Sequence, residues 1–242
     1  MGGGVVIDTG FDVRTDAGGR DPDSHSRTLR RYHRLLWSKP LPRGAVFDLD
    51  TRLHHKSTLG EFWLSSDAIT HTYTSWSRPA RLVEAIRQVP EQETTAFFGL
   101  GCTVGAYLVF PAQKQVNGKW RASINQRRGI HPRIRDRFDL TLECIRRHYL
   151  GLDSPLTECF DVYSDFFALF ESFRGYVEHF LLQDLVDDRF TSIRFFHGSG
   201  DFSQDPLPAS GVDDYREYMT QSMNFIRDRN ERIAAYADAH LS

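Results

Sequence analysis

The stretch WRASINQRRGIHPRIRDRFDLTLECIRRHY, from Trp120 to Tyr149, decides how the rest of the chain is interpreted. It predicts a short strand that leads into a glycine-interrupted loop at residues 125–129, and then a helix with Asp136 as its N-cap. Gly151 is a natural terminator of that helix. Apolar residues recur at helical spacing and predict its buried stripe, which consists of Phe138, Leu142, Ile145 and Tyr149.

The polar residues of this stretch form the candidate site. Arginine forks suit phosphate or carboxylate oxygens, amides suit a base or sugar edge, and carboxylates suit proton transfer. The predicted ligand-binding residues are Lys39, Asn125, Gln126, Arg128, Arg137 and Arg146, and the predicted catalytic residues are Asp139 and Glu143. The leading hypothesis is an anionic, nucleotide-like or phosphorylated ligand, with hydrolase or transferase activity as an extension. Alternatively, the arginines and carboxylates form a structural salt-bridged layer.

The distribution of charge supports a rival function. Residues 20–57 hold nine Lys or Arg against four acids, residues 113–149 hold ten against three, and residues 150–242 hold seven against seventeen. If the two basic segments share a face, a non-catalytic protein could dock an acidic partner or nucleic acid there. Alternatively, the acidic C-terminal part neutralises them.

Composition and motifs limit the other function classes. A chain of 242 residues with 40% hydrophobic and 26% charged residues is typical of a soluble globule, and we expect one domain at 23–242 after a loosely ordered lead-in at 1–22. No apolar run is long enough to span a membrane and no leader is recognised, which favours the cytoplasm. The three scattered cysteines predict reduced core residues. GxSxG, Walker, HExxH and CxxC motifs are absent, so no cofactor is predicted.

The remaining elements predict an α+β fold, in which a mostly antiparallel sheet packs on a buried Phe-rich helix with flanking helices. Helices are expected over 26–37, 78–89 and 213–241, and one long apolar helical region with at most one break over 154–186. Strands are expected over 45–49, 61–65, 94–98, 106–110, 120–124 and 192–196. Asn117-Gly118 predicts a hairpin.

One run of residues resembles a set of metal ligands. Asp21, Asp23 and His25 alternate along the chain, but the same residues are ordinary turn and helix-cap chemistry, which is the favoured interpretation. His54 and His55 lie in a predicted connection, where adjacent histidines are expected to point to opposite sides. No metal site is therefore predicted. Ser65, Ser66 and Asp67 are expected to close a strand, where they cap a turn or contact a ligand; capping is the favoured interpretation.

Several long motifs are similar to those of a bacterial family known only as a domain of unknown function. They are SHSRTLRRYHRLLWSKPLP at 24–42, LHHKSTLGEFWLSSD at 53–67, SINQRRG at 123–129, DRFDLTLECIRRHY at 136–149 and GYVEHFLLQDLV at 175–186. The resemblance extends from about Phe11 to Ile233. It implies a prokaryotic source and a single domain, and it implies no activity.

Overall fold

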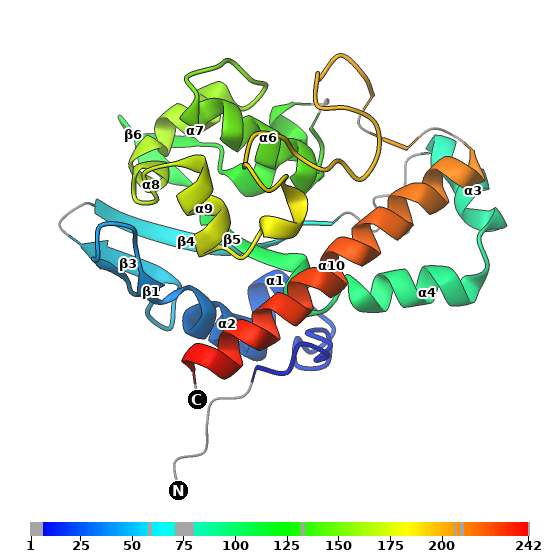
Figure 1. The fold of residues 1–242 in the computed structure, drawn as a ribbon, viewed down its shortest axis with the longest axis horizontal. Coiled ribbons are helices and arrows are strands. Elements are labelled where there is room, and N and C mark those ends of the chain that lie inside the picture. The colour runs from blue at the N-terminus through cyan, green and yellow to red at the C-terminus, as the bar shows by residue number, and fades with distance from the viewer. Residues whose placement is uncertain are drawn as a thin grey trace, which may run out of the picture.

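The computed structural model describes residues 7–57, 60–70, 80–131, 134–205, 207–208 and 211–241, apart from the side chains of residues 57, 81, 128 and 129. It has the predicted α+β architecture (Figure 1). The strands are β1 Lys39–Pro40, β2 Val46–Phe47, β3 His54–Ser57, β4 Gly60–Ala68, β5 Tyr107–Pro111, β6 Lys114–Val116 and β7 Lys119–Arg121.

The α-helices are α1 Pro22–His25, α2 Arg27–Trp37, α3 Val83–Gln88, α4 Glu91–Leu100, α5 Arg127–Ile130, α6 Phe138–Tyr149, α7 Thr157–Val162, α8 Ser164–Ala168, α9 Phe173–His179 and α10 Val212–His240. Short 3-10 turns are η1 Ala80–Leu82, η2 Val104–Ala106, η3 Ile124–Gln126 and η4 Gln183–Leu185. Among the described helices, none combines the length and apolar composition that crossing a membrane requires.

Every strand pairing in the described residues is antiparallel, as predicted. The central sheet has the order β3-β4-β5, and Ser65 of β4 lies opposite Phe110 of β5. In Figure 1, helices α6 to α9 lie above this sheet and α1 and α2 lie below it, while α10 crosses the molecule diagonally. Helices α1 and α8 both pack against β4, so the long central strand connects the two layers.

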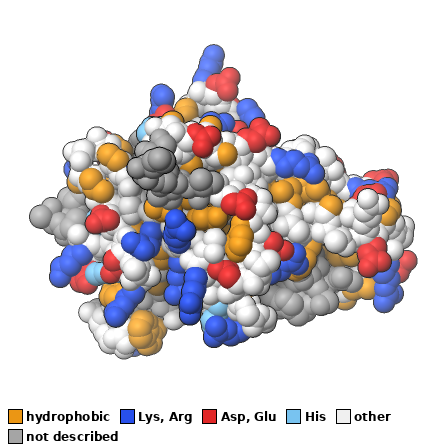
Figure 2. Space-filling model, turned by 90° about the horizontal axis from the view of Figure 1, so that it is seen from below, with side chains coloured by type: hydrophobic (Ala, Val, Ile, Leu, Met, Phe, Trp, Pro, Cys, Tyr) orange, Lys and Arg blue, Asp and Glu red, His pale blue; other side chains and the backbone are white. Residues whose placement is uncertain are grey.

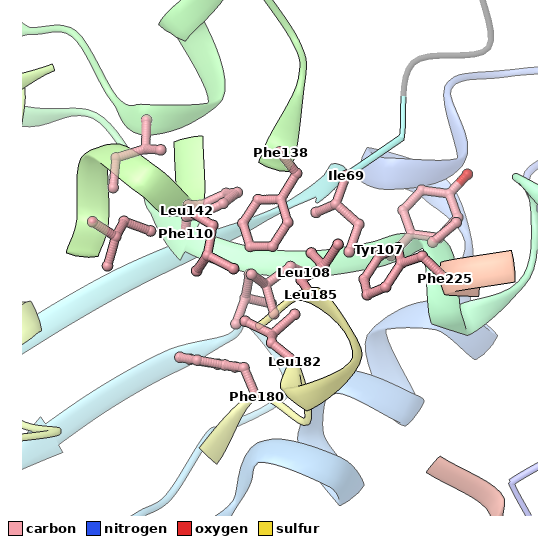
Figure 3. Close-up of a cluster of buried hydrophobic side chains, with 14 of the residues drawn as sticks. Ile69, Tyr107, Leu108, Phe110, Phe138, Leu142, Phe180, Leu182, Leu185 and Phe225 are labelled. Carbon is pink, nitrogen blue, oxygen red and sulfur yellow. The ribbon is translucent and has the colours of Figure 1, made fainter. Parts of the chain in front are cut away.

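The core is apolar and rich in aromatic rings. Figure 3 shows side chains from β5, α6 and the segment after α9 gathered in one cluster, among them Leu108, Phe110, Phe138, Leu142, Leu182 and Leu185. The rings of Phe110 and Phe138 have their centres 6.0 Å apart, which joins the sheet to α6. Ile7, Val13 and Ala17 are also buried, so the core extends into the segment predicted as a loose lead-in.

Arg229 of α10 is a fully buried cation that ties three segments together. Its guanidinium donates to the carbonyl oxygens of Gly105 and Tyr107, both at 2.8 Å, and of Phe180 and Leu181 at 3.1 and 3.2 Å. These carbonyls belong to η2, β5 and the turn after α9. Because a buried charge is costly without such partners, Arg229 determines how α10 lies across the fold.

Several elements form as predicted because their signals are local. Ser26 accepts the backbone N–H of Leu29 at 3.0 Å and caps α2. Asn117 and Gly118 both have positive φ, 52° and 73°, in the turn between β6 and β7. Gly151 follows the C-cap of α6 with φ 66°.

Other predictions were wrong. Residues 94–98 belong to α4 and not to a strand, because Pro90 and the acidic first turn at Glu91 and Glu93 start a helix that overrides the β-branched threonines. The N-cap of α6 is Arg137 rather than Asp136. His54 and His55 belong to β3 rather than to a connection, although only His55 is fully buried, at 1% exposure.

The apolar region at 154–186 is broken repeatedly. It forms α7, α8, α9 and η4, and the chain turns at Glu171 and Leu181, whose φ values are 64° and 54°. An apolar sequence shows that a segment is buried but does not show where it reverses. Around residues 192–196, the structure has only an isolated bridge between Val186 and Ile193, so no strand forms there.

Candidate functional site

A hollow of about 560 Å³ opens beside β4, on the side of the η3 turn. Its lining is dominated by carboxylates, hydroxyls and side-chain amides, with one large aromatic ring. It consists of Asp21, Asp23, Ser24, Ser65, Ser66, Asp67, Ala112, Gln113, Trp120, Ser123, Asn125 and Gln126. We call this hollow the β4 pocket.

The β4 pocket is formed by segments that are distant in sequence. Side chains alternate along a strand, so Ser65 and Asp67 of β4 point to the same face. Helix α1 packs against β4 and brings Asp23 to the pocket. Asn125 of η3 and Trp120 of β7 contribute from the segment that follows the central sheet.

Asn125 and Gln126 are the two predicted ligand-binding residues that line this pocket. The Asn125 amide N–H group donates to Ser65 Oγ at 2.6 Å and to the Ser66 carbonyl at 3.1 Å. Because a carbonyl can only accept, the amide nitrogen must face β4. Asn125 Oδ1 is then buried without a partner among the described residues. Gln126 forms a capping box with Ser123, whose backbone N–H donates to Gln126 Oε1 at 3.1 Å.

Asp67 is paired with a cation beneath the pocket. Fully buried Arg127 donates to Asp67 Oδ2 and, at 3.1 Å, to the carbonyl of Asp136. Asp67 keeps 18% of its side chain exposed. Burial raises the pKa of Asp67 to about 6, although the charge of Arg127 opposes the rise. Asp67 is therefore mostly ionised at neutral pH.

Asp23 has the opposite protonation state. Burial, followed by the negative charges of Asp67 and Asp21, raises the pKa of Asp23 to about 8. A backbone hydrogen bond from Ala68 opposes the rise. Asp23 Oδ1 is buried and has no partner in the described part of the chain. At neutral pH Asp23 is thus mostly protonated, whereas Asp67 is mostly ionised.

The nearby histidine does not activate Ser66. Trp37 Nε1–H donates to His33 Nδ1 at 3.0 Å, so the proton of this neutral ring is on Nε2, which donates to Ser66 Oγ at 2.9 Å. Burial and the charge of Arg229 lower the pKa of His33 to about 3. His33 therefore cannot take a proton from Ser66, and a Ser–His nucleophile pair is excluded at this position.

The predicted catalytic residue Asp139 lies within the protein interior and not in the β4 pocket. Its carboxylate accepts hydrogen bonds from Arg137, with Nε at 3.1 Å, and from the backbone N–H of Phe196 at 2.9 Å. Arg137 Nη2 also donates to the carbonyl of His197 at 2.6 Å. Both side chains are at most 1% exposed. Their contacts join α6 to the segment at 196–197, which favours a structural role.

Glu143 and Arg146 form a second group on α6. Glu143 accepts from Arg146 Nε at 2.7 Å and from Arg147 Nε at 2.8 Å. Arg147 Nη2 reaches the carbonyl of Gly200 at 3.1 Å. Glu143 thus pairs with both arginines, and Arg147 joins α6 to the loop around residue 200.

Lys39 and Arg128 complete the predicted set. Lys39 Nζ lies 4.4 Å from the ring centre of Tyr236 and 5.4 Å from that of Trp37, so this predicted ligand-binding residue contacts aromatic rings outside the β4 pocket. Burial, with the charge of Arg229, lowers the pKa of Lys39 to about 7. The side chain of Arg128 lies outside the described residues.

One group among the described residues has metal-ligand spacing. Ligand-type atoms of His197, Asp214 and Glu217 all lie within 4.8 Å of one another. Asp214 lies in the first turn of α10, where the helix dipole stabilises negative charge without an ion, and Glu217 follows in the next turn. Since exposed acids are common at such positions, this arrangement alone does not indicate a metal centre.

Sequence reasoning assigned Asp23 to a turn and Asp67 to the end of a strand. Asp67 instead lies inside β4, opposite Leu108 of β5. The alternation Asp21, Asp23, His25 was the available signal, but the sequence does not show that α1 packs on β4. Trp120 was recognised only as part of a strand.

Fold and pocket together define an α+β protein with a carboxylate-rich hollow at the edge of a small antiparallel sheet. The chain belongs to a family of unknown function, DUF6994, whose model matches residues 7–233. This confirms the resemblance to a domain of unknown function. No curated protein and no solved structure matches the chain.

Proposed function

We propose that the β4 pocket binds a small polar ligand and that Asp23 and Asp67 exchange protons with it. The observation that carries this proposal is a hollow of about 560 Å³ that is lined by Asp23 and Asp67, two carboxyl groups of raised pKa, together with hydroxyls and side-chain amides. Such groups donate and accept hydrogen bonds, so a polar ligand finds partners of both kinds there. The volume lies within the usual range for small-molecule sites.

The lining favours a neutral or cationic ligand over the phosphorylated one expected from the sequence. Three acidic side chains line the pocket, and no Lys or Arg is among its described lining residues. An anion would be repelled by ionised Asp67, whose partner Arg127 is already engaged. For Arg137, Arg146, Asp139 and Glu143, we propose a structural role, because each is held within an ion pair.

The protonation states support hydrolase or transferase chemistry. Asp23, with a pKa of about 8, donates a proton to a leaving oxygen, while Asp67, with a pKa of about 6, accepts one from an attacking hydroxyl or water. Asp23 is mostly protonated and Asp67 is mostly ionised at the same time only between the two pKa values, about 6 and about 8. Turnover is therefore expected to peak between pH 6 and 8, and Asp23→Asn to abolish it.

A thermal-shift screen tests binding, because a ligand that binds only the native state raises the melting temperature. The panel contains saccharides and polyols, amines, nucleosides and phosphorylated compounds. We expect hits among the unphosphorylated classes that are lost in Asn125→Ala and kept in Asn224→Ala, a control on the exposed side of α10. Hits confined to phosphorylated compounds would contradict the charge argument.

A second proposal concerns the basic side of α2. Arg27, Arg30, Arg31 and Arg34 recur at helical spacing, and Arg27 and Arg31 are exposed. Figure 2 shows Lys and Arg side chains clustered on part of the lower face, the side of the molecule on which α2 lies in Figure 1. This supports docking of an acidic partner or nucleic acid. Oligonucleotide binding that weakens gradually over successive Arg→Ala changes, and steeply with salt, would support it.

A further inference from the structure

The β4 pocket combines a flat aromatic surface with groups that both donate and accept hydrogen bonds. Trp120 is 64% exposed, although burying an indole ring is strongly favourable. It lies on β7 opposite Gln115, which is also exposed, so the hairpin itself does not cover the ring. An exposed tryptophan beside a polar hollow is therefore available to a ligand with one apolar face.

The polar groups require hydroxyl partners. Ionised Asp67 accepts hydrogen bonds, whereas the protonated carboxyl of Asp23, the hydroxyl of Ser65 and the exposed amide of Gln113 can also donate. A hydroxyl does both at once, whereas a protonated amine only donates and a phosphate dianion only accepts. Many hydroxyls on a ring with an apolar C–H face are the chemical signature of a sugar.

We infer that the β4 pocket takes a neutral carbohydrate, with Trp120 lying against the apolar face of a sugar ring and with Asp23 and Ser65, which Asn125 positions, bonding its hydroxyls. This inference rests on the proposed ligand-binding function and names the ligand class. A volume of about 560 Å³ accommodates one or two sugar rings. Ionised Asp67 selects against acidic sugars, because a carboxylate on the ligand would meet a carboxylate in the pocket.

A glycan array of neutral and acidic saccharides, followed by calorimetric titration of the hits, tests the inference with the full chain. We expect neutral glycans to bind. Trp120→Ala should weaken binding about tenfold, as loss of an aromatic contact does, and Trp120→Phe should retain most of it. Trp63→Ala is the matched control: Trp63 is 48% exposed, stacks on His54 and does not line the pocket. It should change affinity less than twofold.

The outcomes separate the carbohydrate inference from the function on which it rests. A blank array overturns the carbohydrate assignment. If nucleosides or amines then bind and Asn125→Ala abolishes that binding, the proposed ligand-binding function of the β4 pocket is supported and only the carbohydrate assignment is wrong. Glycan binding that resists both Asn125→Ala and Trp120→Ala places the glycan elsewhere and overturns the inference. Binding only of acidic glycans overturns it too, since Asp67 should reject them.

Discussion

Arg229→Met tests whether one buried cation holds α10 in place. The substitution keeps an extended side chain but removes the donors that bind the carbonyls of Gly105, Tyr107, Phe180 and Leu181. A buried acceptor left unsatisfied costs about 1–3 kcal/mol, so the four together lose about 4–12 kcal/mol before compensation. Burial lowers the pKa of Arg229 to about 9, so the group is still charged at neutral pH.

Removing that charge also removes its desolvation cost, which offsets part of the loss. We therefore expect Arg229→Met to lower the free energy of unfolding by about 3–5 kcal/mol, which is the usual cost of breaking a buried charged network. For a chain of this size, each kcal/mol lowers the melting temperature by about 2–4 °C. Urea denaturation followed by circular dichroism measures the free energy directly.

Arg227→Met is the matched control, because it makes the same change two residues earlier on the same helix. Arg227 is exposed and its described hydrogen bond is a 3.4 Å contact with Asn224. Its loss should alter stability by no more than about 0.5 kcal/mol. If Arg229→Met costs less than about 1 kcal/mol, the carbonyl contacts do not hold the helix and the reasoning fails.

Three further predictions follow from single contacts. Asp23→Asn should be more stable than the parent protein at pH 9, by at least about 2 kcal/mol, and equal to it at pH 4. Because folding raises the pKa of Asp23, the stabilisation from its bound proton is fully present below the unfolded pKa and is lost as pH rises through about 8. Asparagine does not titrate and avoids this loss, and urea titrations at both pH values measure the difference. Gly105→Ala should cost about 1–3 kcal/mol or more, because the new Cβ would lie 2.5 Å from Asn230 Oδ1 and 2.8 Å from a backbone oxygen of α10; a normal melting temperature would rule out this close packing. Glu143→Ala should lower stability by about 1–3 kcal/mol in chemical denaturation while leaving ligand binding in the β4 pocket unchanged; lost binding in a stably folded variant would restore a role in the site.

The elements that local sequence determines are those whose signals lie within a few residues. Helix α2 has its cap at Ser26 and its apolar spacing in one segment, and the β6–β7 hairpin has its turn in Asn117 and Gly118. The final helix, α10, forms over nearly the predicted range because its periodic pattern is long. Fold class follows from such elements, because their order limits how they can pack.

Tertiary structure decided where the apolar segments reverse and which polar groups meet. The helical region expected over 154–186 is divided where Glu171 and Leu181 take positive φ, and these turns depend on what the rings pack against. Of the predicted site residues, Asn125 and Gln126 reach the β4 pocket, whereas the polar groups of α6 pair with one another and with the 196–200 loop.

The protonation pattern of the β4 pocket also depends on tertiary contacts. By sequence alone, Asp23 and Asp67 are ordinary acids on a turn and a strand. Packing α1 against β4 buries both carboxyls near each other and puts Arg127 beneath one of them. The sequence by itself determined α2, α10, the β6–β7 hairpin and the amides at 125 and 126 as site residues. Only the tertiary structure decided the carboxyl pair, because desolvation and charge proximity depend on which distant segments meet.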